Sequence, residues 1–305
     1  MEFWYIYTYL PRILRDEQQD PKLALVWCAH PLFLFCSPLR GRTEMTGRTI
    51  SRGRTLCRRY ASVMTRSCDI IHHSPTVDEF EERFFSSSTP VLLKGYIKDW
   101  PAVSTWTLDR FRELGGELLV PVEVGPHYMH PDFMRNEVPL ALFLDYLEAA
   151  GEKDAPDHNV YLAQHDLLTH GTMQTLRADI QDFPFSQLGR GDRYSQMVWM
   201  GPAGTVTPCH IDPYHNLLAQ IQGSKRVLLF PPDATPCLYP STDPLQPNTS
   251  QVDVESPDLA QFPAFGDVAP VEALVGEGDV LFIPRKWWHH VRSLTRSTSL
   301  SFWWL

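Results

Sequence analysis

Apolar residues are spaced in two different ways along this chain. In the first half the spacing is mostly helical, because residues three or four apart share one face of a helix. It predicts helices beginning after Thr76, over 106–114 and over 139–150, with a short buried strand over 90–95. Thr76 and Glu79 also have the spacing of a capping box, in which each side chain pairs with an unpaired amide of the first turn.

The second half consists of short apolar runs separated by Gly, Pro and Asp. Many short strands with turn residues between them indicate an all-β barrel or sandwich. Gly223-Ser224 lies between two of the runs and predicts a tight hairpin. The proline-rich segment 231–273 is interpreted as a long insertion between strands. The predicted strands are 160–163, 197–200, 216–221, 226–230, 280–283 and 299–304.

The chain begins with a basic segment. Residues 40–66 hold eight Arg and a single acid, Glu44, a composition that buries little and predicts a disordered leader over 1–70. The alternatives are an organelle-targeting presequence or a nuclear or nucleic-acid-binding patch. The remaining residues, 71–305, are predicted to form one domain with a helical part over 71–155 and a β core over 156–305.

Composition places the chain among folded proteins and separates its two ends by charge. Hydrophobic residues make up 43% and charged residues 21%, which are globular values. Residues 1–66 carry eleven Lys/Arg against five Asp/Glu, and the rest carries sixteen against thirty-one. We therefore expect a basic protein or peptide substrate, and nucleic-acid contact at most through the Arg-rich leader. The apolar stretch 23–35 is shorter than the about 20 residues that a membrane span needs, so no membrane association is expected.

Two side chains with metal-ligand chemistry lie close together in the second half. His210 and Asp212 are two positions apart in TPCHIDP, so in a strand both point to the same face. An imidazole and a carboxylate from one strand, joined by a histidine from a later strand, make the facial triad that binds non-haem Fe(II). Alone, such a pair of residues is a weak signal.

The third ligand comes from a more specific pattern. The run GDVLFIPRKWWH over 278–289 contains a turn, a buried strand, a terminating proline and then His289. This pattern resembles the second motif of the cupin fold, in which the returning histidine faces the metal. We therefore predict that His210, Asp212 and His289 bind a metal and are the catalytic centre. His290 is expected to point to the opposite face.

Longer segments resemble the JmjC-domain oxygenases. They are NLLAQIQGSKR over 216–226, NTSQVDVE over 248–255, KWWHHVRSL over 286–294 and SFWW over 301–304, and the similarity extends over roughly 75–305. The resemblance implies a double-stranded β-helix of the cupin or jelly-roll type, mostly β with surrounding helices. It also implies Fe(II) as cofactor, 2-oxoglutarate as cosubstrate and dioxygen as oxidant.

Family positions for the cosubstrate are occupied by residues of suitable chemistry. Lys225 stands at the position of the cation that pairs with the far carboxylate of 2-oxoglutarate, on a strand expected to pair with the one that bears Asn216. Tyr161 and Thr207 match hydroxyl donors, and Asn216 matches an amide near the iron-binding end. Other family positions that line the cavity are occupied by Gln164, Trp199 and Trp303.

Three functions remain open at this point. The first is hydroxylation of a protein substrate at arginine, which suits the acidic body because guanidinium pairs with carboxylates bidentately. Demethylation of N-methyl-lysine in a histone by the same chemistry is the second, and a non-catalytic metal-binding cupin scaffold is the third. An intracellular location in nucleus or cytoplasm is expected, or a mitochondrial one if the leader is a presequence.

Overall fold

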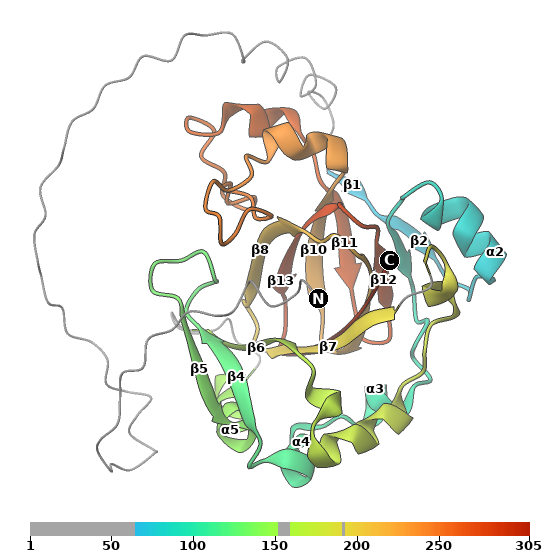
Figure 1. Cartoon of the computed structure of the whole chain (residues 1–305), viewed down its shortest axis with the longest axis vertical. Coiled ribbons are helices and arrows are strands. Elements are labelled where there is room, and N and C mark those ends of the chain that lie inside the picture. Colours follow the sequence, from blue (N-terminus) through green and yellow to red (C-terminus); the bar gives the residue numbers. More distant parts are fainter. Residues whose placement is uncertain (1–64, 152–158, 191–192) are drawn as a thin grey trace, which may run out of the picture. The chain divides into compact units, whose positions relative to one another are not determined.

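The computed structural model describes residues 65–151, 159–190 and 193–305 (Figure 1). Almost all of the predicted leader therefore lies outside the described residues. Regular structure begins a few residues earlier than predicted, with strands β1 (Arg66–Ser67) and β2 (Asp69–Ile71). Both are held by parallel pairing, β1 with β11 and β2 with β3, so the end of the leader segment belongs to the sheets.

Two sheets make up the β core. The five-stranded sheet has the order β1-β11-β10-β13-β8, and the nine-stranded sheet has the order β2-β3-β12-β9-β14-β7-β6-β4-β5. From β7 onward the chain alternates between the sheets, except that β10 and β11 are neighbours in the first. This alternation is the double-stranded β-helix that the sequence predicts. The bounds are β3 (Val91–Leu93), β4 (Leu119–Val124), β5 (Met134–Pro139), β6 (Val160–His165), β7 (Arg193–Gly201), β8 (Val206–Ile211), β9 (His215–Gln222), β10 (Lys225–Phe230), β11 (Val271–Val275), β12 (Val280–Ile283), β13 (Trp288–Ser293) and β14 (Ser297–Trp304).

The predicted hairpin at Gly223-Ser224 is wrong. β9 pairs with β12 and β14, whereas β10 pairs with β11 and β13, so the chain crosses from one sheet to the other at this turn. Gly223 has a φ of 73°, and a Cβ there would collide with the carbonyl of Arg296, so glycine is required. The expected pairing between the strands of Lys225 and Asn216 is wrong for the same reason.

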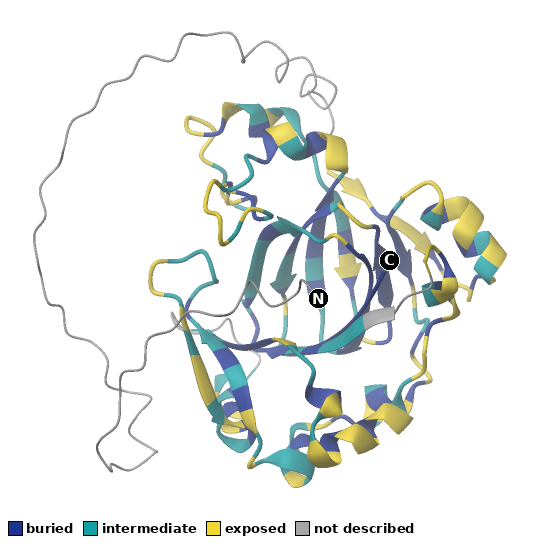
Figure 2. Cartoon of the chain, in the orientation of Figure 1, coloured by how far each residue is buried: buried dark blue, intermediate teal, exposed yellow. Residues whose placement is uncertain are grey.

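Helices cover the outside of the nine-stranded sheet. They are α2 (Val77–Phe80), which continues as the π-helical turn η2 (Glu81–Phe85), α3 (Pro101–Thr105), α4 (Leu108–Gly115), α5 (Leu140–Ala150) and the 3₁₀ helices η3 (Leu167–Thr169), η4 (Gly171–Asp179) and η5 (Pro184–Gln187). Phe80 of α2 stacks on Phe185 with ring centroids 4.1 Å apart and contacts Phe282 of β12 at 4.9 Å. The apolar stripe of α5 is buried as predicted. Figure 2 shows the buried positions concentrated along the strands.

The start of α2 forms half of the predicted capping box. The hydroxyl of Thr76 accepts a hydrogen bond from the amide of Glu79 at 3.1 Å. The Glu79 carboxylate does not turn back to the helix end, because it pairs with His73 and Arg83 instead. Arg83 is four residues after Glu79 on the same helical face, and this pair competes with the capping box.

The segment between β10 and β11 is an insertion, as predicted, although β11 already begins at Val271. It contains η6 (Pro232–Cys237) and η7 (Pro263–Asp267). Its apolar residues, among them Val252 and Phe265, form a cluster with Cys209 of β8 and Trp288 of β13. The insertion thus packs on the two strands that bear the predicted metal ligands. None of the helices in the described ranges has the length and apolar character needed to cross a membrane.

The buried side chain of Asp279 links the turn before β12 to the residues that follow β3. Its carboxylate accepts hydrogen bonds from the amides of Gly95 at 2.9 Å and Gly276 at 2.8 Å and from Lys94 at 2.6 Å. We expect Asp279→Ala to lower the free energy of unfolding by about 2–4 kcal/mol, because buried amides and a cation lose their acceptor. Denaturant titration measures the change. Glu277→Ala, at an exposed position in the same turn, is the control, and equal losses in both variants would contradict the assignment.

Candidate active site

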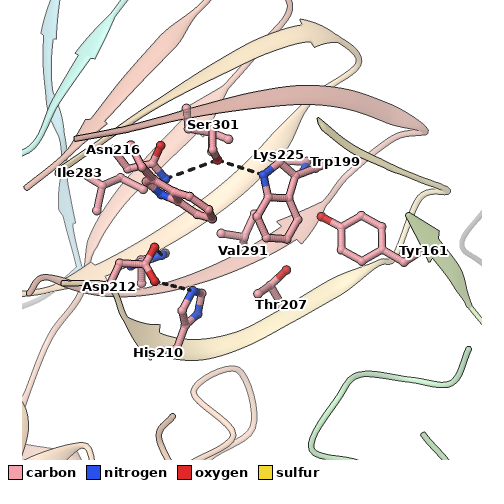
Figure 3. A pocket seen from close by; sticks show the side chains of 13 residues that line it. Tyr161, Trp199, Thr207, His210, Asp212, Asn216, Lys225, Ile283, Val291 and Ser301 are labelled. Carbon is pink, nitrogen blue, oxygen red and sulfur yellow. Dashed lines mark hydrogen bonds and ion pairs between the residues drawn. The ribbon is translucent and has the colours of Figure 1, made fainter. Parts of the chain in front are cut away.

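A cavity of about 380 Å³ lies between the two sheets (Figure 3). Both sheets contribute side chains to it, and so does the loop that follows β8. The alternation of strands places these side chains opposite one another although they are distant in sequence. The lining residues are Tyr161, Trp199, Thr207, His210, Asp212, Asn216, Leu218, Lys225, Ile283, His289, Val291, Ser301 and Trp303.

The three predicted metal ligands meet at one end of the cavity. His210 lies on β8, Asp212 follows directly after it, and His289 is the partner of His210 on the adjacent strand β13. The Asp212 carboxylate is 4.0 Å from Nε2 of His210 and 3.7 Å from Nε2 of His289. All three ligand atoms lie within 4.8 Å of one another. Two imidazoles and one carboxylate in this arrangement fit Fe(II) and leave further coordination positions for other ligands.

Hydrogen bonds orient both histidines toward this point. Nδ1 of His210 lies 2.8 Å from the carbonyl of Pro208, and Nδ1 of His289 lies 3.0 Å from that of Trp287. A backbone carbonyl only accepts, so each Nδ1 carries the proton and each Nε2 presents its lone pair. Asn248 of the insertion fixes the end of β8, because its amide donates to the carbonyl of Ile211 at 3.0 Å.

Burial shifts the pKa values of His289 and Asp212 in opposite directions. It lowers the pKa of His289 well below its usual value, and the neighbouring His210 acts in the same direction, so His289 is neutral at neutral pH. Burial raises the pKa of Asp212, which His210 partly offsets. A bound cation favours the ionised carboxylate, because an opposite charge stabilises it.

A buried cation lies on the five-stranded side of the cavity. Lys225 is 2% exposed, and its Nζ lies 5.8 Å from the centre of the Tyr161 ring. Burial alone lowers its pKa to about 7. Tyr161 is hydrogen-bonded to Thr207, and burial raises the pKa of its hydroxyl. The three side chains together offer an ammonium and two hydroxyls to an anion.

Ser301 is a lining residue that the sequence did not single out. Its hydroxyl accepts hydrogen bonds from Nε1 of Trp199 at 3.0 Å and from the amide of Asn216 at 3.5 Å (Figure 3). The carbonyl oxygen of Asn216 and Nε1 of Trp303 are buried and have no partner in the described part of the chain. Both polar atoms are available to a ligand. Ser301 could have been identified from the sequence, because polar residues alternate along β14 at Ser297, Ser299 and Ser301.

The side chains of His290 and Gln164 both lie outside the cavity, the first as predicted and the second not. His290 points away from the cavity as expected, and its Nε2 lies 3.7 Å from the carboxylate of Glu255 on the insertion. Gln164, by contrast, does not line the cavity. The pairing of β6 with β7 shifts register between Leu162 and His165, and Gln164 has a φ of 49°, so its side chain is exposed.

The comparison with protein families agrees with this geometry. Residues 77–305 match the model of the cupin-like domain, which covers well over half of the sequence. The chain therefore belongs to the cupin-like family.

Within this family it resembles proteins with a JmjC domain, as the sequence motifs indicate. It is 39% identical over 230 residues to Lysine-specific demethylase JMJ30 of Arabidopsis thaliana, a match that covers 75% of this chain and 53% of that protein. Lysine-specific demethylase 8 of Danio rerio is 39% identical over 236 residues, with 76% and 57% covered. Jumonji C domain-containing protein 5 of Drosophila melanogaster is 35% identical over 246 residues, with 79% and 61% covered. The chain thus spans little more than half the length of these relatives.

Proposed function

We propose that this protein is an Fe(II)- and 2-oxoglutarate-dependent oxygenase that hydroxylates a protein substrate at arginine. The observation that carries the oxygenase assignment is one cavity with a complete facial triad at one end and a buried lysine on its wall. This lysine pairs with no carboxylate among the described residues. A metal-binding scaffold needs the triad but has no use for the lysine. Similarity to proteins named as demethylases supports the same chemistry.

Each group in the cavity has a role in this proposal. His210, Asp212 and His289 hold the iron, which together with 2-oxoglutarate and dioxygen supplies the oxidation of a substrate C–H bond. The ammonium of Lys225 and the hydroxyls of Tyr161 and Thr207 bind the far carboxylate of 2-oxoglutarate. Asn216 binds near the other end of the cosubstrate. Apolar side chains of Leu218, Ile283 and Val291 keep water out of the space between them.

A second pocket next to the cavity supports arginine as the substrate residue. It shares Tyr161 with the cavity and contains Glu123 and Asn159, whose carbonyl oxygen has no partner among the described residues. Burial raises the pKa of Glu123 to about 7, although Arg135 opposes this shift. A carboxylate and an amide oxygen are both acceptors, and guanidinium offers five N–H donors in a planar fork.

N-methyl-lysine demethylation is the second candidate, because two of the relatives are named lysine-specific demethylases. Methylation removes N–H donors from the lysine ammonium, and methylated ammonium groups are typically bound by aromatic rings. The paired acceptors Glu123 and Asn159 therefore fit arginine better. A catalytically inactive cupin scaffold is the third candidate.

Succinate formation and mass spectrometry of the substrate distinguish the three candidates. The full chain, loaded with Fe(II), is supplied with 2-oxoglutarate and with matched peptides containing Arg, methyl-Arg or methyl-Lys. Arginine hydroxylation adds one oxygen to the Arg peptide, whereas demethylation removes a methyl group from the Lys peptide. Absence of succinate under all conditions would leave only the scaffold.

Glu123→Gln tests the substrate pocket. We expect a rise in KM for an Arg peptide of about tenfold or more, because a charge-assisted hydrogen bond becomes a neutral one. Affinity for 2-oxoglutarate should stay unchanged. Glu137→Gln lies on the neighbouring strand β5 at an exposed position and is the matched control. An unchanged KM in Glu123→Gln would argue against guanidinium binding at this pocket.

The pH dependence of cosubstrate binding follows from Lys225. Its pKa of about 7 means that the free protein loses the ammonium proton as the pH rises above neutrality. Binding of the carboxylate requires the charged form, so the dissociation constant should increase about tenfold per pH unit above 7 and level off below it. Titration calorimetry between pH 6 and 9 measures this slope together with proton uptake. Lys225→Met should abolish the slope, and its persistence there would assign the effect to another group.

The location and partners of the protein belong to the same proposal. We expect a basic protein substrate and an intracellular site of action, in the nucleus or cytoplasm. The alternative of a mitochondrial presequence depends on the Arg-rich leader, almost all of which lies outside the described residues.

A further inference from the structure

A second cluster of metal-ligand side chains lies at the end of β6. His165, Asp166 and His170 each place one ligand atom within 4.8 Å of the other two. Oδ1 of Asp166 is 3.5 Å from Nδ1 of His165 and 3.0 Å from Nε2 of His170. The two imidazole rings are stacked, with centroids 5.1 Å apart and planes inclined by 22°. No residue of this cluster belongs to the facial triad.

The backbone holds these three residues in place. His165 is the last residue of β6 and pairs with Val198 after the register shift, and the 3₁₀ helix η3 then returns the chain so that His170 faces Asp166. Leu167 and Leu168, between the ligands, are buried and anchor the turn. The Thr169 hydroxyl donates to the second carboxylate oxygen of Asp166 at 3.0 Å and so fixes its rotation.

The separations fit a tetrahedral ion. Zn²⁺ binds histidine nitrogen and carboxylate oxygen at about 2.0–2.2 Å, and two ligands of a tetrahedron at that radius are roughly 3.3–3.6 Å apart. The observed 3.0 and 3.5 Å lie close to this range. Exposure of the Asp166 and His170 side chains, 49% and 40%, leaves a path for the ion and room for a water ligand.

Internal hydrogen bonding explains only part of the arrangement. The contact between His170 and Asp166 is an ordinary ion pair. His165, however, is 12% exposed, and its Nδ1 lies 3.5 Å from the Asp166 carboxylate, farther than the 3.0 Å of the His170 pair. Its Nε2, on the other side of the ring, is buried without a partner among the described residues. An ion shared by the three side chains would add a partner for the His165 imidazole beyond its stacking on His170 and its contact with Asp166.

We propose that His165, Asp166 and His170 form a second metal site that binds Zn²⁺. The site stands independently of the proposed oxygenase function, because it uses none of the triad or cosubstrate residues. It is carried by the strand that also bears Tyr161, so an ion bound there would tie the end of that strand to η3.

Zinc retention by the full chain tests the proposal. The triad is first removed with Asp212→Ala and His289→Ala, and the zinc that stays bound after dialysis against a weak chelator is measured by mass spectrometry. We expect one Zn²⁺ per chain in this background. Adding His170→Gln should weaken zinc affinity by at least about tenfold. Losing a residue that only hydrogen-bonds to a metal ligand typically costs about that much, and losing the ligand itself should cost no less.

His73→Gln is the control, because His73 is an exposed histidine paired with a single carboxylate. Thermal unfolding with and without zinc guards against a folding defect, since a bound ion raises the Tm of the folded chain. Zinc should raise the Tm of the background and of His73→Gln but not of His170→Gln. The proposal is overturned if the background retains no zinc, or if His170→Gln retains it as strongly.

Discussion

Asp212→Ala is expected to lose bound iron and turnover while the fold remains intact. The carboxylate is the single acidic member of the triad, so its removal leaves only two imidazoles to hold the cation. Asp212 lies outside the strand bounds and its side chain lies at the cavity, so the cores described above keep their packing. Iron content, succinate formation and circular dichroism are measured on the same preparation.

Two sets of variants sharpen this test. Asp109→Ala removes a carboxylate that is 83% exposed and should leave iron and activity unchanged. His289→Ala should match Asp212→Ala, whereas His290→Ala should keep the iron because its side chain faces Glu255 on the opposite side of β13. Retention of iron and activity in Asp212→Ala would reject the triad.

Lys225→Ala is expected to keep the iron and lose affinity for 2-oxoglutarate. The variant leaves the far carboxylate of the cosubstrate buried without a cation, which typically costs about 2–5 kcal/mol for one partner of a buried charge pair. Affinity should therefore fall by tens- to thousands-fold at tenfold per 1.4 kcal/mol. Calorimetric titration of the manganese-loaded protein with 2-oxoglutarate gives the dissociation constants.

Lys98→Ala is the matched control, because Lys98 is exposed. It should bind 2-oxoglutarate like the unchanged protein. An unaltered dissociation constant in Lys225→Ala would remove the cosubstrate assignment, and with it the main argument against a metal-binding scaffold. Loss of iron in Lys225→Ala would instead indicate that the lysine supports the metal end of the cavity.

The β core was predictable because most of its strands contain short apolar runs bounded by turn residues. The run over 280–283 is fully buried as β12, and its four apolar residues predict a buried strand without any information on the strands that pair with it. The β4–β5 hairpin was not predicted, since β5 is largely exposed and β4 contains Pro121. Which strands pair was also out of reach, because the turn at Gly223 is equally compatible with a hairpin and with a crossing between sheets.

Some residues of the candidate site could be predicted from the sequence and others could not. The positions of His210, Asp212 and His289 follow from a two-residue spacing and a short motif, and the structure brings all three together. Glu123 gave no signal in the sequence, because its burial depends on the unpredicted hairpin and on contact between distant strands. Gln164 was assigned to the cavity, but a register shift that no local pattern reveals turns it outward.

The alternation of strands between the two sheets has a consequence for how the protein folds. His210 and His289 are direct partners across β8 and β13, and the whole insertion lies between them in the chain. Val280 of β12 is likewise paired with Leu93 of β3, from the other end of the domain. Chains dominated by such distant pairings fold slowly, because loop closure costs entropy before the contacts form. His210 and His289 therefore come together only after β13 has been synthesised.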